Sequence, residues 1–205
     1  MKRHNLSPLP LDMQSAKSLM DGVSTCLSRQ GWFNQNWLVS VHCFPPLPQT
    51  PVSVTMHVFR PHWLNEDGQG IHFEAQFGPK QWAKLEIPVM LHFFHCGTIP
   101  GTKKKRMAVT KPLVDSIYDL VSSWPGYSFR VGRYGAQSFS CTLHLVESLA
   151  GLPGSFDPSL ASLSDTVSWD TSTAEHFQGM VSKEISRLCI ELGPAIDHAL
   201  AQALK

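Results

Sequence analysis

Histidines at alternate positions of segments predicted to form β-strands are the residues best suited to chemistry. His42, His57, His72 and His144 each lie on the more polar side of a different segment, and Glu74 follows His72 by two residues. Residues two apart on a strand point to the same face, so these side chains would converge if their strands are neighbours. Imidazole and carboxylate are ligands of zinc and similar divalent ions. Three such ligands with one open position make a hydrolytic centre.

The same histidines have a plainer interpretation, in which Ser, Thr and His side chains cover the solvent-facing side of a sheet. A register shift of one residue would send the histidines to opposite faces. The chain also contains 10 histidines, so some coincidence of position is expected. The zinc-like site is therefore a hypothesis that depends on strand order and register, and the sequence has no other cofactor motif.

A second candidate is the run from His92 to Cys96. His92 could serve as the base that activates the Cys96 thiol, because the thiolate is the nucleophilic form of cysteine. The spacing does not place all the polar residues of this run around one ion. The favoured interpretation is the end of a partly buried strand.

Clustered cations form a third candidate, which would contact the phosphates of a nucleic acid or a small ligand. The residues are Lys103, Lys104, Lys105 and Arg106 in a predicted loop, with Arg130 and Arg133 near a later turn. A net charge of +1 provides no general attraction to nucleic acid. The favoured interpretation is a solvated loop whose charge blunts a sheet edge.

Hydrophobic periodicity predicts the elements that must position these residues. In chain order they are a helix near 13–27, strands at 38–44, 52–58, 71–77 and 84–94, a helix at 111–124, strands at 127–131 and 138–146, and a helix from 172. Short connections between the strands predict an α+β fold. We expect an antiparallel sheet of about six strands with helices packed on one face, in the order α-ββββ-α-ββ-α.

Three regions are predicted along the chain. Residues 1–146 form the α+β core domain, and residues 147–170 form a flexible loop or strap, since a connection this long is unusual inside a compact domain. Residues 171–205 form an amphipathic helix that packs on the core or on a partner subunit. Gly193 and Pro194 are expected to break or kink this helix, and Pro112 is expected at the first position of the preceding one.

Composition excludes several classes of protein. The hydrophobic fraction of 42% suffices for a core and argues against disorder. No run approaches the roughly 18 apolar residues of a membrane span, and the first residues do not resemble a secretory signal. The five cysteines are widely spaced and odd in number, which indicates a reducing, cytoplasmic compartment.

The sequence contains none of the common nucleotide-binding, hydrolase or calcium-binding motifs. We therefore predict a non-enzymatic binding or interaction protein, with a protein partner or a second copy of the chain as its target and a homodimer as one form. The alternatives are a metal-dependent hydrolase or nuclease that uses the histidines, and a nucleic-acid-binding protein that uses the cations. Whether the chain is an enzyme stays open at this stage.

Overall fold

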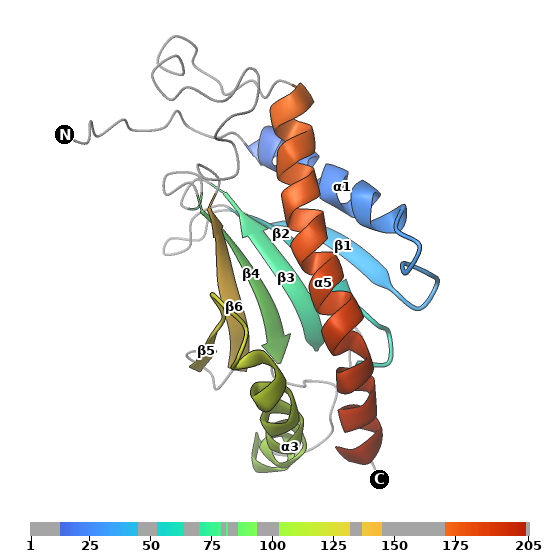
Figure 1. The fold of residues 1–205 in the computed structure, drawn as a ribbon, viewed down its shortest axis with the longest axis vertical. Helices are drawn as coiled ribbons and strands as arrows, with labels where there is room; N and C mark the ends of the chain where they lie inside the picture. Colours follow the sequence, from blue (N-terminus) through green and yellow to red (C-terminus); the bar gives the residue numbers. More distant parts are fainter. Residues whose placement is uncertain are drawn as a thin grey trace, which may run out of the picture.

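The computed structural model describes residues 13–44, 53–63, 70–78, 81, 86–93, 103–131, 137–144 and 171–203. The helices are α1 (Met13–Ser28), α3 (Lys103–Val121) and α5 (Thr171–Ala203). The strands are β1 (Leu38–Phe44), β2 (Ser53–Phe59), β3 (Ile71–Phe77), β4 (Glu86–Phe93), β5 (Ser128–Val131) and β6 (Gln137–His144). The predicted α+β class and the predicted order of elements are confirmed (Figure 1).

The six strands form one sheet in the order β1-β2-β3-β4-β6-β5. Every neighbouring pair is antiparallel, as predicted. The first four strands follow chain order, and the last two are exchanged, because the chain passes through α3 and returns at the far edge as β5. Strand β6 then pairs with both β4 and β5.

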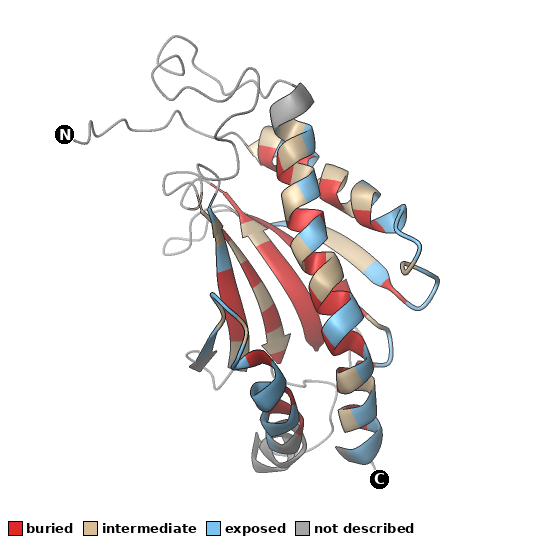
Figure 2. Ribbon diagram, in the orientation of Figure 1, coloured by how far each residue is buried: buried red, intermediate tan, exposed pale blue. Residues whose placement is uncertain are grey.

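One face of the sheet is apolar and is covered by the helices. On β3 the residues Ile71, Phe73, Ala75 and Phe77 are fully buried, and they alternate with polar residues as a strand requires. Buried positions also recur along α5, the long helix that crosses the sheet (Figure 2). The polar side chains of the strands lie on the face opposite the helices.

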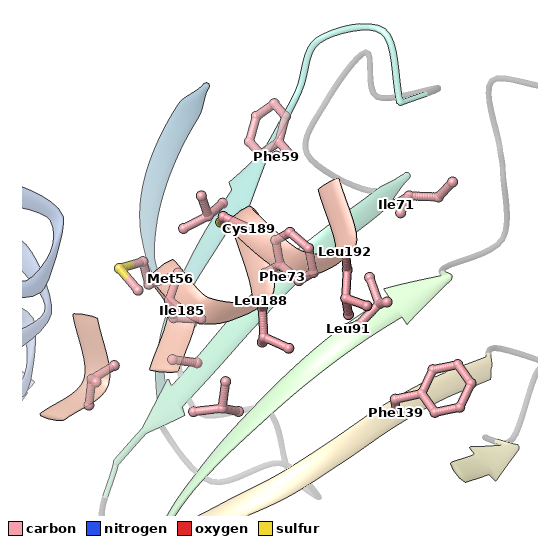
Figure 3. Close-up of a cluster of buried hydrophobic side chains, with 14 of the residues drawn as sticks. Met56, Phe59, Ile71, Phe73, Leu91, Phe139, Ile185, Leu188, Cys189 and Leu192 are labelled. Atoms are coloured by element: carbon pink, nitrogen blue, oxygen red, sulfur yellow. The ribbon is translucent and has the colours of Figure 1, made fainter. Parts of the chain in front are cut away.

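The core lies between α5 and the central strands. The apolar stripe of α5 is buried from Phe177 to Leu200. Figure 3 shows Leu188 and Leu192 of this stripe close to Phe73 of β3 and Leu91 of β4. Helix α5 therefore packs on its own core, and its apolar stripe no longer argues for a partner copy. The predicted homodimer stays a prediction, and the predicted strap at 147–170 lies outside the described residues.

Two predictions about helix ends are wrong. Helix α3 begins at Lys103, so the predicted basic loop is the first part of a helix, and Pro112 lies inside it. The residues before this proline are mostly strong helix formers, and the buried side chains of Leu113, Ile117 and Val121 hold the rest of the helix on the core. These contacts offset the loss of about 3 kcal/mol that an internal proline causes.

Of the break or kink predicted at Gly193 and Pro194, the break is also wrong, because α5 continues through both residues to Ala203, and the kink stays a prediction. Leu192 and Ile196 are buried on either side of the proline. At Gly193 a Cβ atom would lie 3.1 Å from a ring carbon of Trp37, so the missing side chain lets this ring pack against the helix. Tertiary contacts on both sides thus hold the helix together across the lost hydrogen bond.

Asp197, one turn beyond the proline, ties α5 to the chain that follows β2. The Trp63 indole N–H donates to Asp197 Oδ1 over 2.7 Å, and His62 Nε2 lies 2.8 Å from the same oxygen. Arg60 pairs with the other carboxylate oxygen, and its guanidinium lies 4.5 Å from the ring centre of Trp37. One carboxylate therefore accepts hydrogen bonds from three side chains. We call Asp197 and these three residues the clamp at Asp197.

We expect Asp197→Ala to lower the free energy of unfolding by about 2 to 3 kcal/mol, because it leaves the Trp63 N–H and the Arg60 guanidinium without their acceptor. Asp197→Asn keeps an oxygen for Trp63 and should lose less. Equilibrium unfolding in urea measures both variants. Equal losses in the two would contradict the role given to the Trp63 hydrogen bond.

None of the described helices is long and apolar enough to cross a membrane.

Candidate metal centre

The polar face of the sheet carries a row of four imidazoles, one from each of the strands β1 to β4. The row consists of His42, His57, His72 and His92. Successive ring centres lie 5.4, 4.2 and 5.4 Å apart along it. The strand register produces this arrangement, because His72 stands directly opposite His92, and His57 stands opposite Glu74.

Glu74 lies within reach of three of these rings. Its Oε2 is 3.3 Å from His72 Nε2, 3.7 Å from His57 Nε2 and 3.6 Å from His92 Nδ1. The other oxygen, Oε1, accepts a hydrogen bond from the Gln76 amide. The side chains of His72 and Glu74 are only 3% and 5% exposed. We call Glu74, His57, His72 and His92 the Glu74 cluster.

Hydrogen bonds on the outside of the cluster orient two of the rings. His72 Nδ1 lies 2.9 Å from the carbonyl oxygen of Gly70, which can only accept, so Nδ1 carries a hydrogen. His92 Nε2 lies 3.3 Å from the Met90 sulfur, another group without a hydrogen to donate. In its neutral form each ring therefore turns a lone pair toward Glu74 Oε2, whereas the protonated form of His72 donates a hydrogen bond to this oxygen. Lone pairs and a carboxylate oxygen that face one another favour a cation between them.

Burial sets the charges of the cluster. It lowers the pKa of His57 to about 4, with a further contribution from His72, and it lowers the pKa of His92 as well. Burial alone would raise the pKa of Glu74, but the hydrogen bond with His72 and the charges of the neighbouring histidines lower it to about 2. At neutral pH, His57 and His92 are neutral and Glu74 is ionised. Metal ligands need this state of protonation.

The distances fit coordination better than ion pairing. Zinc bonds of about 2.0 to 2.2 Å in a tetrahedral site place neighbouring ligand atoms roughly 3.3 to 3.6 Å apart. A charge-assisted hydrogen bond is shorter, at about 2.7 to 2.9 Å. The ligand atoms of His57, His72 and Glu74 all lie within 4.8 Å of one another. His57 turns Nε2 toward Glu74, and its buried Nδ1 has no hydrogen-bond partner among the residues that the structure describes.

Two of the histidines proposed from the sequence lie away from this group. His42 is exposed at the end of the row, next to His57, and its Nε2 lies 2.9 Å from Ser40 Oγ. His144 is on the same face but stands opposite Glu86. That position is four residues along β6 from the level of the cluster, about 13 Å away. The structure therefore brings together His57, His72 and Glu74 and leaves His144 apart.

His92 is a member of the cluster that sequence reasoning did not include. The sequence pairs it with Cys96, which lies outside the described residues. The alternation of β4 already places His92 on one face with Met90, which is the signal that could have found it. What the alternation does not reveal is that His92 stands opposite His72.

The cations proposed for phosphate binding are placed only in part. Lys103, Lys104, Lys105 and Arg106 belong to α3, and Arg130 belongs to the edge strand β5. Their side chains are outside the described part of the structure, as is Arg133 altogether. Contact with nucleic acid through these residues stays a prediction.

Fold and site together define an α+β protein with helices on one face of its sheet and a buried histidine–carboxylate cluster on the other. No protein-family model, curated protein or solved structure matches the chain.

The cluster should make the metal-free protein sensitive to acid. His57 has a folded pKa of about 4 against an ordinary value of 6.5, so the unfolded chain binds more protons between these pH values, and stability falls as pH falls. The lowered pKa of Glu74 acts in the same direction, from 4.5 down to about 2. We expect a loss on the order of 3 kcal/mol from His57 between pH 6.5 and 4. Urea unfolding of metal-free protein at several pH values measures it.

His57→Gln is the matched variant for this measurement, because its side chain takes up no proton in that range. Its stability should depend less on pH between 6.5 and 4 than that of the wild type. Identical pH profiles for the two proteins would contradict the lowered pKa of His57.

Proposed function

We propose that this protein binds a zinc-class divalent ion through His57, His72 and Glu74. The observation that carries the proposal is the position of Glu74 Oε2, a buried anionic oxygen with imidazole nitrogens at 3.3 to 3.7 Å. Nitrogen and carboxylate donors suit zinc and its neighbours among the first-row metals, whereas calcium and magnesium prefer oxygen alone.

The surroundings of these residues support metal binding. His72 donates its outer N–H to the Gly70 carbonyl, and Glu74 accepts a hydrogen bond from Gln76. Metal-binding histidines and carboxylates are commonly oriented by such outer partners. The proposed ligands also come from the adjacent strands β2 and β3 of a regular sheet, which hold side chains more firmly than loops do.

Titration of metal-free protein with zinc, followed by removal of excess ion and elemental analysis, tests the proposal. We expect one zinc per chain in the wild type and none retained in His72→Ala. His144→Ala is the matched control, since it removes an imidazole from the same face but outside the cluster, and it should bind zinc like the wild type. A wild-type protein that retains no zinc, iron, cobalt or manganese would overturn the proposal.

A hydrolase or nuclease is the second candidate. Two histidines and one carboxylate with a free fourth position are the ligand set of several hydrolytic zinc centres. This candidate predicts zinc-dependent cleavage of an ester or phosphodiester that disappears in Glu74→Gln. Metal bound at full occupancy without such activity would contradict the hydrolase candidate and support metal binding without catalysis.

The cellular setting and the partners belong to the proposal as well. Cys26, Cys43, Cys141 and Cys189 are free thiols, and the last two are buried. Free, buried cysteines are typical of a reducing compartment, so we propose a cytoplasmic protein. A homodimer is the partner arrangement proposed from the sequence. Light scattering that gives a monomer at micromolar concentration would contradict it.

A further inference from the structure

We infer that His92 supplies a fourth ligand to the proposed ion through Nδ1, which closes the centre. The inference rests on the proposed function and extends it. A closed four-ligand centre holds its ion without offering a position to substrate, as structural zinc sites do. The chain would then belong with proteins that are stabilised by metal or that carry it, and not with metallohydrolases.

The position of His92 resembles that of a proposed ligand. Its Nδ1 lies 3.6 Å from Glu74 Oε2, and His57 Nε2 lies 3.7 Å from the same oxygen on the side of β2. His92 comes from β4 and stands directly opposite His72 in the register of the sheet. The carboxylate is thus bracketed by imidazoles from the strands on both sides of its own.

The orientation of the His92 ring also supports coordination through Nδ1. With Nε2–H directed to the Met90 sulfur at 3.3 Å, the lone pair of Nδ1 faces inward. This repeats the arrangement of His72, whose outer N–H is held by Gly70. The His92 side chain is 19% exposed, so it lies between the buried pair and solvent and can cover the ion.

Full coordination requires His92 to move toward two of the other ligands, because it lies outside the group formed by His57, His72 and Glu74. The ligand atoms of His57, His72 and Glu74 already lie within 4.8 Å of one another, and His92 meets them through Glu74. The rings of His72 and His92 have centres 5.4 Å apart, and we infer that a bound ion draws His92 Nδ1 toward the other three ligand atoms. Once complete, the centre joins β2, β3 and β4.

Cobalt substitution tests whether the fourth position is filled. The visible spectrum of bound Co²⁺ reports its coordination number and geometry, and azide changes the spectrum only if it can reach an open position. We expect the spectrum of the wild-type cobalt protein to be insensitive to azide. In His92→Ala, azide should change the spectrum, and cobalt affinity should fall at least tenfold.

His42→Ala is the matched control, because it removes an exposed imidazole of the same row that is outside the Glu74 cluster. It should leave both cobalt affinity and the response to azide as in the wild type. A wild-type spectrum that responds to azide, or a His92→Ala variant with wild-type affinity, would overturn the fourth ligand while leaving the three-ligand site in place. A wild-type protein that binds no cobalt or zinc would overturn the proposed function and this inference together.

Discussion

Glu74→Gln is expected to abolish metal binding while the metal-free protein stays folded. The substitution removes the anionic ligand at the middle of the cluster, so zinc affinity should fall by more than the roughly 10- to 100-fold that loss of an outer partner causes. The glutamine oxygen can still accept from Gln76. In the wild type, His72 Nε2 lies 3.3 Å from Glu74 Oε2. In the variant, the glutamine amide N–H can donate a hydrogen bond to the lone pair of this nitrogen. Stability without metal should therefore fall at pH 7, because the interactions that lower the pKa of Glu74 are lost, but by less than the roughly 3 to 5 kcal/mol that breaking a buried ion pair costs.

A large loss of stability in metal-free Glu74→Gln is expected instead if the carboxylate is paired with a protonated histidine. Removing one partner of a buried ion pair destabilises a protein by about 3 to 5 kcal/mol. Urea unfolding of metal-free wild type and Glu74→Gln, together with zinc titration of both, separates the two cases. A large loss of stability in Glu74→Gln combined with no zinc binding by the wild type would contradict a metal centre and favour an ion pair.

Phe73→Ala is expected to cause the largest loss of stability. Phe73 lies on β3 between His72 and Glu74 but points to the apolar face, where it is fully buried. Its ring centre is 5.5 Å from that of Trp63 and 6.2 Å from that of Trp37. Truncation of a buried phenylalanine typically costs about 3 to 5 kcal/mol. In a protein of this size that lowers the melting temperature by roughly 10 °C.

Zinc gives this prediction a second readout. An ion that binds only the folded state adds stability set by its concentration and affinity. Because the cluster is on the other face of β3, zinc should stabilise Phe73→Ala and the wild type by similar amounts. Phe73→Leu is the control for volume and should lose less than Phe73→Ala. Losses below about 1 kcal/mol in Phe73→Ala would contradict the core position of this ring.

The faces of the sheet could be predicted because they depend on local spacing. Alternation along 71–77 places Phe73 on one side and His72 with Glu74 on the other, and the structure has this arrangement. A strand has a period of two residues whatever its neighbours are, so one segment is enough to read it. The same local reading predicts the buried stripe of α5 from its helical spacing.

Helix boundaries were predicted less well, because the local signal of proline competes with tertiary packing. Pro112 and Pro194 each remove a backbone hydrogen-bond donor, and both lie inside helices that continue past them. The contact of Trp37 with Gly193 and the clamp at Asp197 are made by residues more than one hundred positions away. No reading of the surrounding sequence reveals such partners.

Membership of the Glu74 cluster was decided by strand order and register, which are long-range properties. The sequence by itself determined that His42, His57, His72 and His144 each lie on the polar side of a strand. The tertiary structure then placed β6 beyond β4, with His144 opposite Glu86, and set His92 opposite His72. A shift of one residue in any pairing would have sent the side chains to the other face. Spacing along the chain thus determines which side chains share a face, and only the paired strands decide which of them meet.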